Sequence, residues 1–239
     1  MTVEKFIKQQ SEAFELSLSD RVKKSQPALP VVTFSMEPGS GGSVIAENVA
    51  KKLGYRYYSK NLLTAMANKA DVKMSVLEAI EKGRPTVFED LVSSILPKDD
   101  YVYKGDYFEQ LKDTIRTIAM IGKAVIVGRG GNFILPREKC FSIRVFAPLE
   151  IRIKNIAYHY KVTLEQAEKR IVNREAKRKA FVRDNFRKDI GDHRHYDLTI
   201  NTERMDLETC TEIVIGAIKG AQVNQVFEKS STYFLRSKQ

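Results

Sequence analysis

The sequence predicts an α/β protein built on a parallel sheet with helices on both faces. Two observations support this prediction: short apolar runs alternate with segments of helical periodicity, and a glycine-rich stretch joins the first run to the first helix. Alternating strands and helices favour right-handed crossovers and a sheet covered on both sides. The chain has 239 residues, of which 43% are hydrophobic. This is enough for a sizeable core in one or two domains.

The predicted strands follow an N-terminal extension. Residues 3–22 have loose helical periodicity and 23–30 form a polar linker, so a helical extension is expected over 1–30. The apolar runs beyond it have the length and content of buried parallel strands. They lie at 31–35, 55–58, 124–128, 141–147 and 197–201.

Segments of helical period separate these runs. They cover 43–53, 106–121, 148–160, a segment that starts after 163, and 206–223. Gly54 and Gly122 stand in the position of C-terminal caps, and Thr163 with Gln166 forms a capping box. The prediction is a folded domain over 31–223, followed by a tail over 224–239.

The net charge of +10 favours a polyanionic partner, such as nucleic acid, nucleotide phosphate or an anionic membrane. From Lys169 to Arg194 there are ten cations and four anions, so six of the ten net charges lie in 26 residues. A solvated helix with a basic face would explain this segment. Taken alone, the segment favours this interpretation, and an arginine-rich segment that closes over phosphates is the alternative that stays open.

The stretch from Val31 to Ser43 has the order of a phosphate cradle: a buried strand, a glycine-rich loop and a helix. Glycines let backbone N–H groups converge on an anion, and the helix N-terminus adds donors and a partial positive charge. The loop does not match G-x-x-x-x-G-K-[ST], because Gly42 stands where the lysine would be. The candidate phosphate-binding residues are Glu37, Gly39, Ser40, Gly41, Gly42 and Ser43.

At these residues the chain resembles the cytidylate kinase-like family, a branch of the P-loop nucleoside monophosphate kinases. The resemblance runs from about Val31 to Val223. Its first motif is S-M-E-P-G-S-G-G from Ser35, where the family typically reads S-R-E-Y-G-S-G-G. The other motifs are Y-Y-S-K from Tyr57, V-I-V-G-R-G from Val125, A-P-L-E from Ala147, and Gly191-Asp192 with Tyr196 to Thr202. The chain departs from the family pattern at three positions. Met36 stands where the family has Arg, Ser43 where it often has Arg, and Ser59 where it has Asp.

The resemblance implies a three-layer P-loop nucleoside monophosphate kinase fold, with a five-stranded parallel sheet in the order 2-3-1-4-5 and a helical lid over about 161–195. It implies transfer of the ATP γ-phosphate to CMP, dCMP or a similar monophosphate. Mg²⁺ is expected to arrive on the nucleotide, with Ser40 and Ser43 as candidate hydroxyls near it. Two alternatives stay open: a catalytically weak nucleotide-binding sensor or regulatory protein, and a nucleic-acid-binding protein, for which interleaved aromatics are missing.

Candidate catalytic residues are cations that could replace the missing lysine. Arg129 directly follows an apolar strand and resembles the family arginine that meets the monophosphate, although a surface salt bridge would also explain it. Arg174, Arg178 and Arg183 are expected to share one side of the long basic helix, the region that forms the lid in related kinases. The candidate acceptor-binding residues are Tyr58, Ser59 and Lys60.

Other composition features exclude further classes of protein. Cys140 and Cys210 have neither metal-site spacing nor the density of a disulfide scaffold, and are expected to be buried as small apolar residues. No stretch approaches the ~18 uncharged apolar residues of a membrane span. A soluble cytoplasmic protein is therefore expected, with ATP and a nucleoside monophosphate as partners and without membrane binding; nucleic acid is the least favoured partner. A homo-oligomer stays open.

Overall fold

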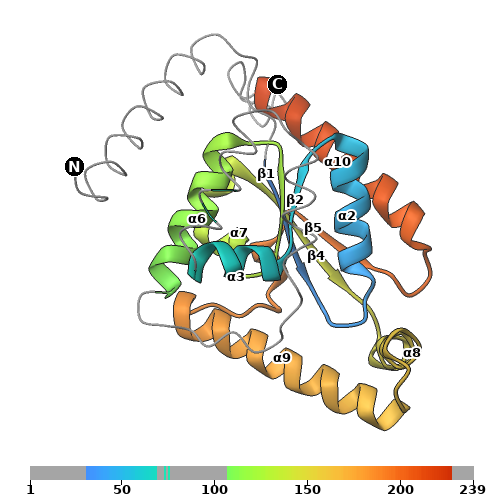
Figure 1. The fold of residues 1–239 in the computed structure, drawn as a ribbon. Helices are drawn as coiled ribbons and strands as arrows, with labels where there is room; N and C mark the ends of the chain where they lie inside the picture. Colours follow the sequence, from blue (N-terminus) through green and yellow to red (C-terminus); the bar gives the residue numbers. More distant parts are fainter. Residues whose placement is uncertain (1–30, 69–72, 74, 76–106, 228–239) are drawn as a thin grey trace, which may run out of the picture.

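Five strands form one parallel sheet in the order β2-β3-β1-β4-β5, which confirms the predicted strand order (Figure 1). The computed structural model describes residues 31–68, 73, 75 and 107–227. The strands are β1 (Val31–Met36), β2 (Arg56–Tyr58), β3 (Ala124–Val127), β4 (Cys140–Phe146) and β5 (Leu198–Asn201). The expected extension over 1–30 lies outside the described residues.

The central strand, β1, leads directly to the predicted phosphate loop. It pairs in parallel with β3, through Val32 and Val125, and with β4, through Val31 and Cys140. All six β1 residues are buried, because helices cover both faces of the sheet. The carboxyl end of β1 at Met36 therefore lies in the middle of one edge of the sheet.

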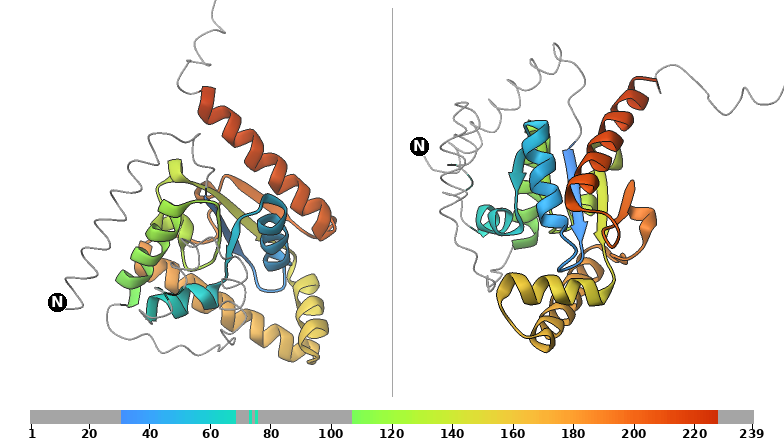
Figure 2. Two further views of the ribbon diagram at one scale, coloured as in Figure 1. Left: turned by 45° about the horizontal axis from the view of Figure 1, so that its top comes forward. Right: turned by 90° about the vertical axis from the view of Figure 1, so that its right-hand side faces the viewer.

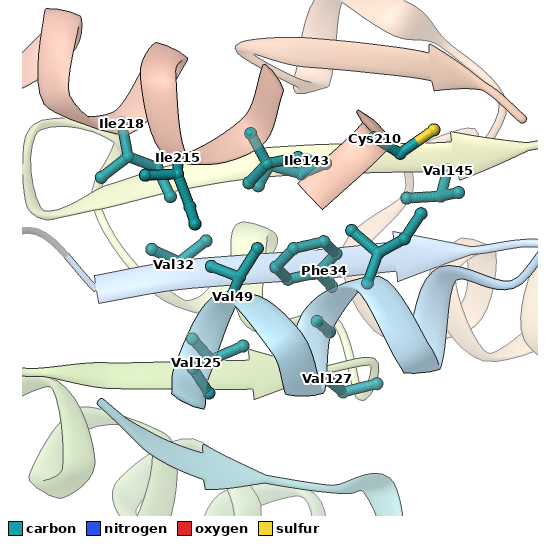
Figure 3. Close-up of a cluster of buried hydrophobic side chains, with 14 of the residues drawn as sticks. Val32, Phe34, Val49, Val125, Val127, Ile143, Val145, Cys210, Ile215 and Ile218 are labelled. Carbon is teal, nitrogen blue, oxygen red and sulfur yellow. The ribbon is translucent and has the colours of Figure 1, made fainter. Parts of the chain in front are cut away.

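Helices form a layer on each face of the sheet (Figures 1 and 2). On one face α2 (Gly42–Leu53) and α10 (Leu207–Phe227) form a core with β1; Val49 and Ile218 lie there with Phe34 (Figure 3). On the other face α3 (Lys60–Asn68), α6 (Tyr107–Ile121) and the short α7 (Gly131–Ile134) enclose a second core. The arrangement confirms the predicted three layers.

Local sequence signals fix the ends of several helices. Gly54 and Gly122 follow α2 and α6 in the left-handed conformation, with φ of 64° and 74°. At the start of α9 (Leu164–Phe186), Thr163 Oγ1 accepts from the Gln166 N–H, and the Gln166 side chain accepts from the Thr163 N–H, both at 3.2 Å. The predicted capping box is confirmed. The last helix, α10, continues to Phe227, beyond the predicted end at 223.

A helical hairpin of α8 (Leu149–Tyr160) and α9 lies across the carboxyl edge of the sheet (Figure 2). Ile156, Ala167 and Ile171 form a small core between the two helices. Cys140 and Cys210 are both buried and unbonded to each other, as expected. In the described part of the chain, no helix is both long and apolar enough to cross a membrane.

Candidate phosphoryl-transfer site

The glycine loop after β1 has a backbone that requires glycine at two positions. Gly39 and Gly41 have φ of 84° and 77°, in the left-handed region that disfavours other residues. A Cβ on Gly39 would lie 2.6 Å from the Arg152 carbonyl oxygen, and one on Gly41 would lie 2.6 Å from Leu207 Cδ2. The loop is therefore closely packed against α8 and the start of α10 on these sides.

The backbone N–H groups of the loop suit an anion. Ser40 N–H donates to the Glu37 carbonyl at 3.2 Å, which tightens the turn. Within residues 31–68, 73, 75 and 107–227, the N–H groups of Gly39, Gly41, Gly42 and Ser43 have no hydrogen-bond acceptor. Two of them belong to the first turn of α2, which adds a partial positive charge. The loop thus has the donors of an anion cradle.

The two candidate metal-binding hydroxyls lie in different environments. Ser40 is 1% exposed, and its Oγ donates to the Glu37 carbonyl at 2.8 Å, so this hydroxyl stabilises the loop itself. Ser43 is exposed on the first turn of α2, and its Oγ donates to Met36 Sδ at 3.2 Å. Among the described residues, no group of three His, Cys, Asp or Glu side chains could hold a metal ion. Ser43 is the hydroxyl that could reach a nucleotide-bound Mg²⁺, which keeps most of its waters.

Gly42 has no room for a side chain. A Cβ there would lie 2.7 Å from Met36 Cβ and 3.1 Å from Val145 Cβ. The position where a standard P-loop carries lysine is therefore closed by Met36, at the end of β1. Positive charge must reach the loop from another element.

Arg129 lies in a second glycine turn, at the carboxyl end of β3. Gly128, Arg129 and Gly130 all have positive φ, of 73°, 54° and 69°. A left-handed conformation costs a non-glycine residue roughly 1 to 2 kcal/mol, and such strain often marks functional sites. The guanidinium Cζ of Arg129 lies 5.9 Å from the ring centres of both Tyr107 and Phe181. These rings hold the cation at the edge of the sheet next to β1.

Arg178 extends from α9 to the start of the glycine loop. Its Nη1 donates to the Met36 carbonyl oxygen, the last of β1. Burial lowers the pKa of Arg178 to about 10, and the positive charges of Arg174 and Arg144 act in the same direction. Arg129 also contributes to this shift. Arg129 after β3, Arg144 of β4 and Arg174 of α9 therefore all lie close enough to repel the Arg178 charge beside the loop.

Arg174 and Arg183 differ in position, which corrects the expectation that Arg174, Arg178 and Arg183 share one side of the helix. Arg174 lies over the Tyr160 ring, with Cζ 5.4 Å from its centre, and is close to Arg178. The Arg183 side chain is 71% exposed and pairs with Asp184 at 2.9 Å. Five residues separate Arg178 and Arg183, about 140° around an α-helix, so Arg183 points away from the loop.

Two arginines near the loop were missed by the sequence analysis, and both contact Glu37. Arg144 of β4 lies 3.5 Å from Glu37 Oε1, and Arg152 of α8 lies 3.3 Å from Glu37 Oε2. Arg152 also pairs with Glu175 of α9 at 2.6 Å. The carboxylate of Glu37 thus lies between two arginine guanidinium groups. A charged residue inside the apolar run 141–147 was the signal that could have identified Arg144.

The acceptor candidates are also placed differently from expectation. Tyr58 is 1% exposed within the core below α3, and burial raises the pKa of its hydroxyl. Its ring therefore cannot stack on a base in this arrangement. Ser59 Oγ accepts from the Leu62 N–H at 3.2 Å and so caps α3. Lys60 is exposed at the start of that helix.

A parallel sheet in the order 2-3-1-4-5, with a glycine loop after its central strand, defines a P-loop kinase fold. The chain belongs to the cytidylate kinase-like family, whose model matches residues 31–204. This family membership agrees with the resemblance found in the sequence motifs.

Curated relatives and solved structures agree with this assignment. A cytidylate kinase of Staphylothermus marinus is 29% identical over 77% of this chain and 93% of its own length. A cytidylate kinase of Ignicoccus hospitalis is 25% identical over 78% of this chain and 97% of its own length. The crystal structure of an uncharacterized protein from Eubacterium ventriosum has a TM-score of 0.61 and 21% identity, and the match covers 80% of this chain and 98% of that one. That structural likeness supports the fold.

Proposed function

We propose that this protein transfers the γ-phosphate of ATP to CMP, dCMP or a similar nucleoside monophosphate. The proposal rests mainly on one observation: Arg129, Arg144, Arg174 and Arg178 gather beside a glycine loop whose N–H groups suit an anion. Mutual repulsion among cations disfavours such a cluster unless an anion binds to it. Membership of the cytidylate kinase-like family gives the class of reaction that this cluster would serve.

In phosphoryl transfer a protein mainly positions two substrates and neutralises charge on the oxygens of the moving group. The N–H groups of Gly39 to Ser43 would hold the donor phosphates. Arg178, beside the loop, would neutralise the transferred group. Arg129, across β1 on the β3 side, would hold the acceptor monophosphate. Mg²⁺ bound to the nucleotide would lie near Ser43 and supply further charge neutralisation.

A second candidate function is a nucleotide-binding sensor or regulatory protein with weak catalysis. The observation that favours it is the closed position at Gly42, where Met36 leaves no space for a lysine. Such a protein would bind ATP at the same loop without efficient transfer. Activity measurements therefore separate the two candidates.

Replacing Arg129 with Ala tests the proposed function directly. Loss of one preorganised charge donor of this kind typically lowers turnover about 10²- to 10³-fold. We expect Arg129→Ala to lower CMP phosphorylation at least about a hundredfold while the melting temperature changes little, because alanine accepts the same backbone conformation about as poorly as arginine. The matched control is Arg116→Ala, on the exposed face of α6, where the arginine pairs with Asp113 at 3.8 Å. Full activity in Arg129→Ala would contradict the assigned role.

A further inference from the structure

Arg144 is an unusual residue for its place in the fold. It lies in β4, where Ile143 and Val145 on either side of it are 0% exposed, and it pairs in register with Ser35 of β1. Its own side chain is 12% exposed. Placing a guanidinium this deep is costly unless it is hydrogen-bonded and paired with an anion. Its partners therefore indicate what it does.

Three groups hold the Arg144 guanidinium at the carboxyl edge of the sheet. Its Nη1 donates to Ser35 Oγ at 2.8 Å, and Tyr196 OH donates to the same oxygen at 3.3 Å. The Tyr196 ring centre lies 5.9 Å from the Arg144 Cζ. The only acidic contact within the described residues is Glu37, at 3.5 Å, which is longer than a normal hydrogen bond. The guanidinium is thus fixed in position but only loosely paired.

A small cavity of about 110 Å³ lies in front of this guanidinium. This small volume suits a compact anion such as a phosphoryl group. Four cations and two carboxylates line it, so positive charge is in excess. The cations are Arg144, Arg152, Arg178 and Lys179, and the carboxylates are Glu37 and Glu175.

We propose that Arg144, together with Arg178, binds a terminal phosphate of the donor nucleotide and replaces the charge of the lysine that Gly42 lacks. Until a nucleotide binds, the Glu37 carboxylate takes the position of the anion, and it moves away when the phosphate binds. The identity of that nucleotide as ATP rests on the proposed function. The phosphate chemistry rests on the cavity and its charges alone.

The other nearby arginines are less suited to this role. Arg152 donates hydrogen bonds to the Ala147 carbonyl at 2.8 Å and to Glu175 at 2.6 Å, so it joins α8 to α9. Arg129 follows β3, on the opposite side of β1 from β4. Arg144 therefore belongs to the donor side of the site, and its removal should leave the acceptor side intact.

Equilibrium binding to the full chain tests this inference, with Mg²⁺ and a non-hydrolysable ATP analogue as the first probe and CMP as the second. A charge-assisted hydrogen bond to phosphate corresponds to about ten- to a hundredfold in affinity. We expect Arg144→Met to weaken binding of the ATP analogue at least about tenfold and to change CMP binding less than about twofold. Arg116→Met, a matched exposed arginine, should change neither affinity.

Two further variants keep the test decisive if Arg144→Met does not fold. Arg144→Lys keeps the charge and loses the planar fork, so it should weaken binding of the ATP analogue by a smaller factor. Glu37→Gln removes the competing carboxylate and should strengthen binding of the analogue severalfold. Opposite signs for the Arg144 and Glu37 variants support the inference. Unchanged binding in both Arg144 variants, or weaker binding in Glu37→Gln, overturns it.

The outcomes separate this inference from the proposed function. Wild-type protein that binds the ATP analogue but transfers no phosphate contradicts the kinase and still leaves Arg144 to be judged by affinity. An active wild type whose Arg144 variants bind the analogue normally overturns Arg144 alone. Wild-type protein that binds no analogue contradicts both.

Discussion

Met36 and Gly42 are complementary in size, and together they explain why this loop departs from the standard P-loop. Met36 is 7% exposed and its Cβ lies in the space that a Cβ on Gly42 would need. A lysine at 42 is therefore excluded by packing as long as Met36 is present. The two positions should behave as a coupled pair in measurements of stability.

Gly42→Ala should destabilise the protein by about 1 to 3 kcal/mol, the usual cost of overpacking a core. The double variant Met36→Gly/Gly42→Ala should be more stable than the sum of the single effects predicts, by at least about 1 kcal/mol, because removing the Met36 Cβ frees the space that the alanine Cβ needs. Chemical denaturation of the four proteins measures this coupling. Gly216→Ala is the control: nothing lies within 4 Å of its Cβ position in α10, so alanine should stabilise by about 0.5 to 1 kcal/mol. Additive costs for the pair would contradict the packing argument.

Arg178 is a residue whose position favours binding over stability. Its pKa falls well below the ordinary arginine value, to about 10 in the folded protein, mainly through burial. A base with a lowered folded pKa binds fewer protons when folded, so its charged form opposes folding below about pH 10. This cost is fully present at pH 7 and is removed only as the pH rises above about 10 toward the ordinary pKa of arginine.

Arg178→Met should therefore have an equal or higher melting temperature than wild type at pH 7 without ligand. It should also lose the rise in melting temperature that ATP gives to wild type, which corresponds to about 2.7 kcal/mol at a hundred times Kd. Thermal unfolding with and without ATP measures both effects, with Arg116→Met as the control. A clear loss of stability with a normal response to ATP would mean that Arg178 is a structural residue only.

For single residues, the sequence predicted which arginines belong to the site better than it predicted where side chains point. Arg129 and Arg178 were identified because one follows an apolar strand and the other lies in a basic helix. Arg183 was assigned to the wrong side of α9. It follows Arg174 by nine residues, which places the two side chains about half a turn apart around the helix. Tyr58 was a candidate for acceptor binding, but period-two alternation in a three-residue strand does not fix which side faces the core.

The α8–α9 hairpin is the element that completes the site. Phe186 lies against Gly130, where a Cβ would be 2.5 Å from its ring. The Phe186 ring packs edge-to-face with Phe108 and at a tilt with Phe133, at 5.4 and 5.3 Å between ring centres. At the other end, Asn155 Nδ2 donates to the Gly39 carbonyl at 2.8 Å. Aromatic packing and polar contacts to the loop thus dock the hairpin on the sheet edge, in the position proposed for a lid.

Glu175→Gln should loosen this docking. Glu175 pairs at 2.6 Å with Arg152, whose side chain is 8% exposed, and weakening a pair of this burial is destabilising because Arg152 keeps only the longer contact with Glu37, at 3.3 Å. We expect amide hydrogen exchange across α9 to become at least about tenfold faster. Glu165→Gln is the matched control, because its pair with Lys169 is 76% exposed at both side chains. Equal exchange in the two variants would contradict a role for Glu175 in docking.

Residues 161–195 should also respond to ligand, because their net positive charge repels itself until an anion bridges the arginines. Hydrogen exchange in this segment should slow when ATP and CMP are added together. Exchange that is already as slow as in the core strands, and that does not change with ligand, would contradict the lid assignment.

At the scale of elements, local signals predicted more than long-range ones. Strand positions followed from apolar runs and helix ends from Gly54, Gly122 and the Thr163 capping box. The docking of Phe186 on Gly130 joins residues far apart in the chain, and no local pattern encodes it. The same reason explains why the contacts of Arg152 with Glu37 and Glu175 were not foreseen.

For the whole molecule, the strand order brings three strand ends and one long helix to a single edge of the sheet. The excess of ten positive charges is thereby divided: some arginines of the basic segment face the loop, and others, such as Arg183, face solvent. The inward group fits nucleotide phosphates better than an extended nucleic-acid backbone, because it surrounds a cavity of about 110 Å³.

The central claim is that this site moves a phosphoryl group from ATP to a nucleoside monophosphate. The most direct test is transfer of γ-labelled phosphate by the full chain in the presence of Mg²⁺, with CMP, dCMP, UMP, AMP and GMP offered one at a time. The account predicts a labelled diphosphate, formed fastest with CMP or dCMP and reduced at least about a hundredfold by Arg129→Ala. A folded wild-type protein that binds ATP but labels none of the five monophosphates would contradict it and would favour the nucleotide sensor.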